Sequence, residues 1–322
     1  MLLSSVAERV YWMSRYIERA ENTARIILVN HNLLLDLPRN MEFGWEALVT
    51  ITGSLELFQQ HYDEATERNV LRFLVADQSN PNCITCSLGM ARENLRTTRA
   101  ILPRATWETL NDLYAYARDN KTSGMSRRGR YAYMRRIIDY CQLLAGKLSS
   151  TMSHDQTYGF IRMGRNMERA DMTGRVIDVR ASNMLPSLSE DLKPFDDIQW
   201  KSVLDSLAGY QMYRRHVHVR IRGRAVLSFL LKDKLFPRTV HYCLAEVEYC
   251  LRGLPGNEPS LRILGRAQRL VQEVDVNDIL SAGLNSFVDD LEKVHAQLHS
   301  QLTATYFAAP EEQAAVPIAA TS

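Results

Sequence analysis

A repeated segment constrains the fold of this chain more than any other feature. Residues 13–25 read MSRYIERAENTAR and residues 163–175 read MGRNMERADMTGR, with seven of the thirteen positions identical. Further matches follow in the same order, such as Leu37-Pro38 with Leu185-Pro186 and Pro81 with Pro237. A long internal repeat sets the architecture, and two joined copies generally bury a shared face. The sequence therefore predicts two homologous units, 1–150 and 151–306, packed about a pseudo-twofold axis as one composite domain.

Helical periodicity runs through both units, and the alternation typical of strands is almost absent. We expect one long helix from Ser4 or Ser5 to about Leu37, and a second from the capping cluster Ser153-His154-Asp155 to about Leu185. The last helix of each unit is expected near 131–150 and 276–306, the polar stretch 119–130 is expected to be a loop, and 307–322 a disordered tail. The predicted fold class is all-α, an elongated helical bundle.

The composition is that of a globular protein, with 46% hydrophobic and 24% charged residues. A net charge of +2 argues against a polyanion-binding surface as the main function, so a nucleic-acid partner is not expected. Five cysteines, an odd number, fit a reducing compartment better than a disulfide framework. With no long apolar run and no leader segment, we expect a cytoplasmic protein without a membrane span.

The positions shared by the two copies occupy both faces of the repeated helix. At 100° per residue Met13, Ile17 and Ala20 fall on one apolar stripe, whereas Glu18 and Arg15 lie on roughly the opposite side. An ordinary surface helix keeps its apolar stripe and lets its polar face drift. The retained charges are therefore candidates for an inter-repeat ion-pair cluster or a groove: Arg15, Glu18, Arg19, Arg25, Arg165, Glu168, Arg169 and Arg175.

Three interpretations of these charges stay open. In the first, Glu18 pairs with Arg169 across the pseudo-twofold axis, and Glu168 reciprocally with Arg19. In the second, the two sets line a groove that binds a carboxylate, an amine or a phosphate. In the third, they form a solvated face with weak pairs one turn apart, such as Glu21 with Arg25.

Other polar clusters are weaker candidates. A basic stretch is either a partner-binding patch or a solvated segment between helices, and its arginines are Arg214, Arg215, Arg220, Arg222 and Arg224. Cys83 and Cys86 form a CxxC pair that is interpreted as packed thiols, because no second pair or nearby histidine pair accompanies it. No motif for a phosphate loop, a hydrolase nucleophile or a metalloprotease occurs, so neither cofactor nor metal is expected.

The ERAENTAR and MERADMTGR segments, the opening MSHDQTYGFIRMGRNMERAD and the FPRTVHYCL helix together resemble the alpha-E family, an all-helical bacterial family. The resemblance covers the chain except its tail, and places the Glu-Arg signature on Glu18-Arg19 and Glu168-Arg169. It implies partners, namely circularly permuted ATP-grasp ligases and transglutaminase-like proteins, and implies no catalytic residue. The first unit departs from the pattern, with Asn82 after Pro81 where the second has Arg238 after Pro237.

Two functions follow as hypotheses. The first is an accessory, non-catalytic subunit of a peptide synthesis or modification system based on ATP-grasp amide ligation, which binds a partner enzyme or a peptide. The alternative is an enzyme of the same pathway, with Glu18 or Glu168 as general base and neighbouring arginines on a carboxylate- or amine-bearing substrate. A general base has to reach its substrate, so the alternative requires these glutamates to border an open cavity.

Overall fold

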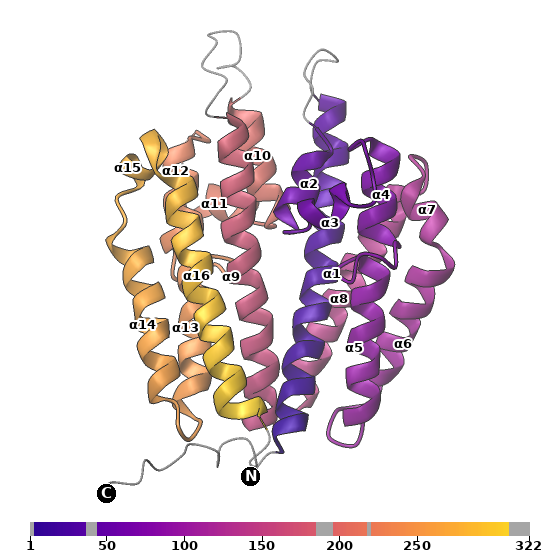
Figure 1. Cartoon of the computed structure of the whole chain (residues 1–322), viewed down its shortest axis with the longest axis vertical. Coiled ribbons are helices and arrows are strands. Elements are labelled where there is room, and N and C mark those ends of the chain that lie inside the picture. The colour runs from indigo at the N-terminus through magenta and orange to yellow at the C-terminus, as the bar shows by residue number, and fades with distance from the viewer. Residues whose placement is uncertain (1–2, 37–43, 185–195, 218–219, 309–322) are drawn as a thin grey trace, which may run out of the picture.

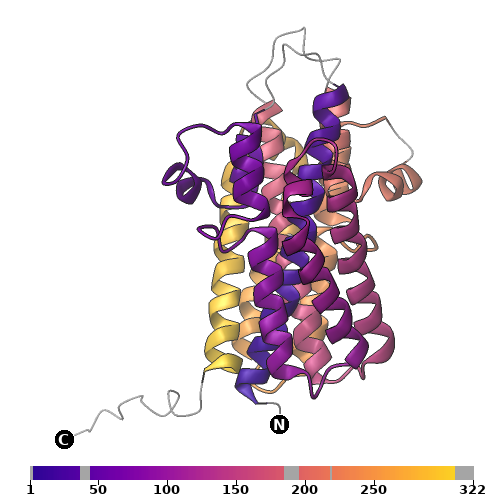
Figure 2. The same cartoon turned by 90° about the vertical axis from the view of Figure 1, so that its right-hand side faces the viewer.

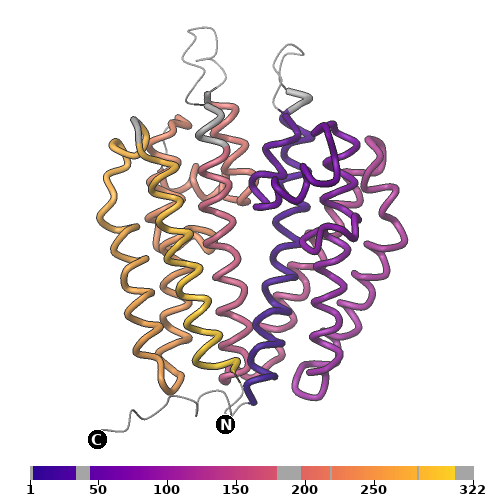
Figure 3. Tube along the Cα trace, viewed as in Figure 1, coloured from indigo at the N-terminus to yellow at the C-terminus, as the bar shows by residue number. Residues whose placement is uncertain are grey.

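Two long helices lie side by side at the centre of the molecule (Figure 1). The computed structural model describes residues 3–36, 44–184, 196–217 and 220–308, and every regular element in these ranges is helical. The all-α prediction is thereby confirmed. The central pair is α1 (Ser4–Asp36) and α9 (Gln156–Met184), which run in the same direction (Figure 3). At 1.5 Å per residue each is about 45–50 Å long.

Each central helix is flanked by its own set of long helices. α1 packs against α5 (Ile84–Thr98) and α8 (Arg130–Thr151), which both contact α6 (Arg104–Asp119). α9 packs against α13 (Val240–Arg252) and α16 (Leu284–Leu302), which both contact α14 (Glu258–Glu273). The view turned by 90° shows these helices standing upright beside one another (Figure 2). The arrangement is compatible with two homologous units about a twofold axis, which remains a prediction.

Shorter helices complete the described structure. They are α2 (Glu46–Ile51), α3 (Leu55–Gln59), α4 (Glu67–Val75), α7 (Lys121–Met125), α10 (Asp196–Ser206), α11 (Tyr210–Val217), α12 (Gly223–Lys232), α15 (Val276–Ala282) and the π-helical turn η2 (Thr303–Phe307). None of the helices in the described ranges is long and apolar enough to cross a membrane.

The long helices begin close to where the sequence predicts them. Asp155 precedes α9, and its carboxylate accepts a hydrogen bond from the Tyr158 backbone N–H at 3.1 Å, as the capping cluster predicts. The predicted ends at Leu37-Pro38 and Leu185-Pro186 lie outside the described residues.

Two other boundaries are corrected. The stretch 119–130, expected to be a loop, contains the short helix α7. The helix expected over 276–306 is divided at Gly283 into α15 and α16, and its last residues form η2. Glycine favours such a break because it lacks a side chain and gains little from helical packing. Of the expected tail, residues 309–322 lie outside the described ranges, whereas Phe307 is buried with its ring 5.2 Å from that of Tyr11.

Helix α1 is buried on both faces, and this accounts for the pattern of shared positions. Met13 and Ala20 on its apolar stripe are fully buried, and Tyr11 and Glu18 on the opposite side are also buried. Helices α5, α8, α9 and α10 all contact α1, so it has no ordinary solvent face. Each of its sides is therefore constrained by a neighbour.

The two central helices approach most closely at a glycine of α9. A Cβ atom at Gly164 would lie 2.3 Å from the Tyr11 backbone oxygen, far inside van der Waals contact. The absence of a side chain at Gly164 therefore sets how near α1 can come to α9. This close approach brings the Glu-Arg segments of the two helices within reach of each other.

Candidate functional site

The carboxylate of Glu168, on α9, is held by two arginines of α1. Its Oε2 lies 2.7 Å from Arg15 Nε and 3.0 Å from an Arg19 terminal nitrogen, and its Oε1 lies 2.6 Å from Arg19 Nε. Arg19 also donates to Asn82 Oδ1 at 2.6 Å. The Glu168 side chain is only 4% exposed. These charge-assisted hydrogen bonds join the two central helices.

Glu18, on α1, forms the reciprocal cluster with arginines of the other half. Its Oε1 lies 2.9 Å from Arg169 Nε and 2.8 Å from an Arg238 terminal nitrogen. Arg238 in addition donates to Glu21 at 2.7 Å and to Asn22 Oδ1 at 2.8 Å. Both carboxylates and Arg238 are buried, so this cluster is closed to solvent.

The two clusters differ because the residues that precede α5 and α13 differ. Thr239 caps α13 by accepting the Tyr242 N–H, and Thr173 donates to the Arg238 carbonyl at 2.8 Å. These contacts hold Arg238 beside Glu18. Before α5 the neutral, shorter Asn82 follows the proline and reaches only Arg19.

A groove opens beside the Glu168 cluster, with a volume of about 800 Å³. Its walls come from α1, α9 and α16, and from the residues just after α2 and before α5. The lining side chains from the three helices are Trp12, Arg15, Arg19, Thr23, Met167, Glu168, Asp171, Met172, Arg175, Asp289, Glu292, Lys293, His295, Ala296 and His299. Glu168 therefore borders an open cavity, whereas Glu18 is not among the lining residues.

Arg175 sits at the end of the groove away from Arg15. Its Nε lies 3.1 Å from Asp171 Oδ2, and a terminal nitrogen lies 3.4 Å from Glu292 on α16. Gly53 has a φ of +65°, and a Cβ there would come within 2.6 Å of the Arg175 guanidinium. The positive φ favours glycine at this position, and a side chain there would displace the end of the Arg175 side chain.

Two histidines of α16 line the middle of the groove. His295 is 5% exposed, and neither of its ring nitrogens has a hydrogen-bond partner among the described residues. Burial, with Arg15 and Arg175 nearby, lowers the pKa of His295 to about 4, so the ring is neutral at pH 7. His299 lies with Nδ1 3.2 Å from the Tyr11 hydroxyl, and burial likewise lowers its pKa to about 4.

The electrostatics of Glu168 favour a fixed anion. Burial alone would raise the pKa of this carboxyl, but Arg19 and Arg15 outweigh burial and lower the pKa to about 2. A general base works best with a pKa near the operating pH. Glu168 is therefore a strong ionic anchor for cations and a weak proton acceptor.

The structure brings together four of the eight Glu-Arg candidates in the groove: Arg15, Arg19, Glu168 and Arg175. The other four lie away from it. Glu18 and Arg169 belong to the closed cluster, and Arg25 pairs with Glu21 at 2.7 Å. Arg165 lies near Glu18. Burial raises the pKa of the Glu18 carboxyl, but Arg169 and Arg238, with a smaller contribution from Arg165, outweigh burial and lower the pKa to about 2.

Several residues of the site were missed by sequence reasoning. Asn82, His295 and His299 line the groove, and Arg238 closes the other cluster. Only the Asn82/Arg238 difference left a signal in the sequence, as the departure after the shared proline. The histidines belong to α16, outside the repeated segment, and nothing in their spacing marks them.

The arginines of the basic stretch lie apart from the groove and are exposed. Arg214 and Arg215 belong to α11, whereas Arg220 and Arg222 precede α12 and Arg224 begins it. Arg222 and Arg224 line a shallow pocket of about 650 Å³ together with Lys232. The patch therefore presents cations to solvent, and its role as a partner-binding surface stays a prediction.

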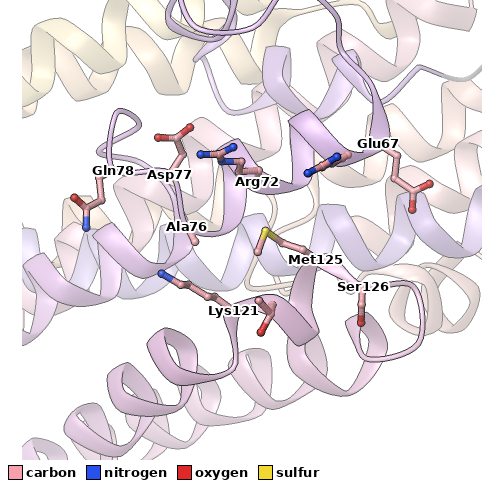
Figure 4. A pocket seen from close by; sticks show the side chains of 10 residues that line it. Glu67, Arg72, Ala76, Asp77, Gln78, Lys121, Met125 and Ser126 are labelled. Carbon is pink, nitrogen blue, oxygen red and sulfur yellow. The ribbon is translucent and has the colours of Figure 1, made fainter.

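A further pocket of about 900 Å³ lies between α4 and α7 (Figure 4). Arg72 on α4 and Lys121 on α7 line it, together with Asp77. Both cations of this pocket are exposed. The groove is the better candidate site because Arg15, Arg19 and Glu168 on its wall are largely buried and paired with one another.

The two cysteines of the CxxC pair lie at the start of α5. Cys83 is buried and caps α5 by accepting the Cys86 N–H at 3.2 Å, and both thiols are free. Within the described ranges no group of three histidine, cysteine or acidic side chains is placed to hold a metal ion.

Mycobacterial proteins of greater length are similar to this chain. Two uncharacterised proteins, one of Mycobacterium bovis and one of Mycobacterium tuberculosis, are each 24% identical to it over 339 residues, which cover 95% of this chain. The chain spans only 37% of the length of these relatives. No solved structure matches it.

The chain also matches a family model over most of its length. Residues 2–307 match the Alpha-E family, described as "a predicted alpha-helical domain with a conserved ER motif". Glu18-Arg19 and Glu168-Arg169, on which the resemblance places this motif, lie at the contact between the two central helices. The chain therefore belongs to the Alpha-E family.

Proposed function

We propose that this chain is a non-catalytic, cytoplasmic accessory subunit of a peptide synthesis or modification system that contains a circularly permuted ATP-grasp amide ligase and a transglutaminase-like protein. One observation carries the proposal: Glu168 lies on the wall of an open groove, yet is clamped by Arg15 and Arg19. Such a site is built to hold charged groups in place. The Alpha-E family supplies the context in which a binding subunit would act.

The protonation state of Glu168 supports binding over catalysis. With a pKa of about 2 the carboxylate stays ionised at neutral pH and has little tendency to take up a proton. The neutral His295 has no carboxylate or hydroxyl partner among the described residues that would orient it as a base. The groove is thus equipped to position a peptide while the partner enzyme performs the ligation.

The basic stretch is the second part of the proposal. Exposed arginines such as Arg222 and Arg224 present guanidinium groups that pair well with carboxylates of a partner protein. Charge complementarity of this kind steers association and fixes the orientation of the complex. We assign the docking of the ligase to this patch.

Co-purification with the ligase tests the proposal. The full chain, tagged and co-expressed with a circularly permuted ATP-grasp ligase from the same organism, is expected to retain that protein on affinity resin. The double variant Arg222→Glu/Arg224→Glu is expected to weaken retention, whereas Arg104→Glu, which alters an arginine 91% exposed on α6, is the matched control. Equal retention by both variants would refute the docking role of the patch, and no retention by the unaltered chain would refute the subunit role.

The enzyme hypothesis keeps one favourable observation, since Glu168 does border an open groove. It requires that the purified chain alone consumes ATP or joins amino acids. The assay is release of inorganic phosphate or formation of amide product by the isolated chain. Turnover that disappears in Glu168→Gln, with the fold intact by circular dichroism, would establish the enzyme in place of the subunit.

A further inference from the structure

The charges in the groove are balanced overall but separated along its length. At one end Arg15 and Arg19 share the single carboxylate of Glu168, which leaves an excess of positive charge. At the other end Arg175 faces both Asp171 and Glu292. Asp289 also lines this end, and the Lys293 that lies beside it is already paired with Asp290. The groove therefore has a cationic end and an anionic end.

The anionic end lacks enough positive charge in the protein itself. Burial and the neighbouring carboxylates of Asp171, Asp178 and Asp289 raise the pKa of Glu292, although Arg175 opposes them. Burial and Asp289 likewise raise the pKa of Asp178, whose buried Oδ1 has no partner among the described residues. An added cation would relieve this crowding of acids.

Unpartnered polar groups also line the groove between and beside the two ends. His295 keeps both ring nitrogens without a partner in the described structure, although it is 5% exposed. Thr23 is fully buried, and its hydroxyl has no partner among the described residues. The matching threonine of the other segment, Thr173, donates to the Arg238 carbonyl. Buried polar groups are normally satisfied, so those that line a cavity indicate a ligand that completes them.

The spacing of the two ends limits the size of such a ligand. Glu168 and Asp171 are three residues apart on α9, and Glu168 and Arg175 seven, which corresponds to about 5 to 10 Å along the helix axis. An extended dipeptide spans at most about 7 Å. The separation of its terminal ammonium and carboxylate groups is thus of the same order as the spacing of the two ends along α9.

We infer that the groove binds a zwitterionic dipeptide, or the equivalent free ends of a short peptide, with its ammonium group at Asp171 and Glu292 and its carboxylate at Arg15 and Arg19. His295 and Thr23 lie on the wall of the groove that the peptide occupies. The inference rests on the proposal that the groove is a binding site, and it names the class of ligand.

Equilibrium dialysis with three peptide pools tests the inference. The full chain is dialysed against pools of dipeptides of the common amino acids, one with free ends, one N-acetylated and one C-amidated, and the retained species are identified by mass spectrometry. A subset of the free dipeptides is expected to be retained, and its members are expected to bind at least about tenfold more weakly when either end is blocked. No retention of free dipeptides, or equal retention of a blocked pool, would overturn the inference.

Two variants locate the binding. Glu292→Gln is expected to weaken binding of the free dipeptides about tenfold and to leave the weak binding of the N-acetylated pool unchanged, because only the ammonium contact is lost. Glu108→Gln, an exposed acid on α6, is the control and is expected to change neither. Equal behaviour of the two variants would place the peptide elsewhere and so refute the site.

The two proposals fail in different ways. If free dipeptides are not retained but the ligase still co-purifies, the ligand class is wrong and the subunit role stands. If dipeptides are retained but the ligase does not co-purify, the subunit role is wrong and the groove stands as a peptide site.

Discussion

Glu168 anchors two guanidinium groups that have few other partners. Replacing it with glutamine removes the negative charge and leaves Arg15 and Arg19 largely buried beside a neutral group. Breaking a buried ion pair from one side costs about 3 kcal/mol or more. We expect Glu168→Gln to lower the free energy of unfolding by about that amount at pH 7 in urea denaturation. The control is Glu93→Gln, which breaks an exposed pair with Arg96 and is expected to cost much less. Similar losses in the two variants would contradict the buried-anchor interpretation.

The same anchor makes stability depend on acid. The folded-state pKa of Glu168 is lowered from 4.5 to about 2, so the folded state holds the carboxylate ionised where the unfolded state takes up a proton. Its contribution is therefore complete above pH 4.5 and is lost as the pH falls towards 2. Glu18, with a pKa also near 2, acts in the same window. Glu168→Gln is expected to make the pH dependence of the unfolding midpoint shallower between these values, without removing the part due to Glu18.

His295 governs a different range of pH. Burial, opposed by Asp171 and aided by Arg15 and Arg175, lowers its pKa from 6.5 to about 4. Between these values the unfolded state therefore binds the proton more readily. Stability from the neutral ring is therefore complete above pH 6.5 and falls as the pH decreases to 4. Since neither ring nitrogen has a described partner, His295→Leu is expected to cost little at pH 7 and to reduce the loss of stability between pH 6.5 and 4. Thermal unfolding across this pH range checks the prediction, and His61→Leu, which replaces an exposed histidine, is the control. An unchanged pH dependence of stability in His295→Leu would contradict the assignment.

At the level of helices, the close approach of α1 and α9 depends on Gly164. A methyl group there would collide with the Tyr11 carbonyl, so the two helices would have to move apart. Gly164→Ala is expected to destabilise the fold by about 1–3 kcal/mol and to loosen the Glu168 cluster. Gly146→Ala on α8 is the matched control, because a Cβ there meets no atom within 4 Å and alanine favours a helix by about 1 kcal/mol. In urea denaturation we expect Gly164→Ala to be destabilised and Gly146→Ala to be slightly stabilised. If both variants were stabilised, the central helices would tolerate separation.

Sequence reasoning succeeded where the signal is local or repeated. The start of α9 follows from the capping residue Asp155. Glu18 lies beside Arg169 and Glu168 beside Arg19, as one of the three interpretations of the shared charges expects, whereas the internal repeat stays a prediction. It missed the break at Gly283, because the apolar periodicity continues through that glycine. The groove itself depends on α16 and on a single exchange before α5, and such tertiary placement leaves no periodic pattern in the chain.

For the whole molecule, the difference between Asn82 and Arg238 decides which Glu-Arg cluster is open. Asn82→Arg would bring a third guanidinium towards Glu168, as Arg238 lies at Glu18. We expect this variant to fill the cationic end of the groove and to lower dipeptide retention at least about tenfold, with the side chain visible in a crystal structure. Asn120→Arg, at the exposed end of α6, is the control for the added charge. Undiminished retention by Asn82→Arg would show that the peptide does not use the Arg15–Arg19 end.

The described structure also brings its first and last helical segments together, since the rings of Tyr11 and Phe307 lie 5.2 Å apart and that of Phe160 lies 6.0 Å from Phe307. A folded unit whose entry and exit are neighbours can be spliced into a loop of another protein without stretching the host. The mycobacterial relatives, in which the matching region is 37% of the length, carry this unit as part of a longer polypeptide. Because the two ends of such a unit meet, a longer polypeptide can enter and leave the unit on the same side.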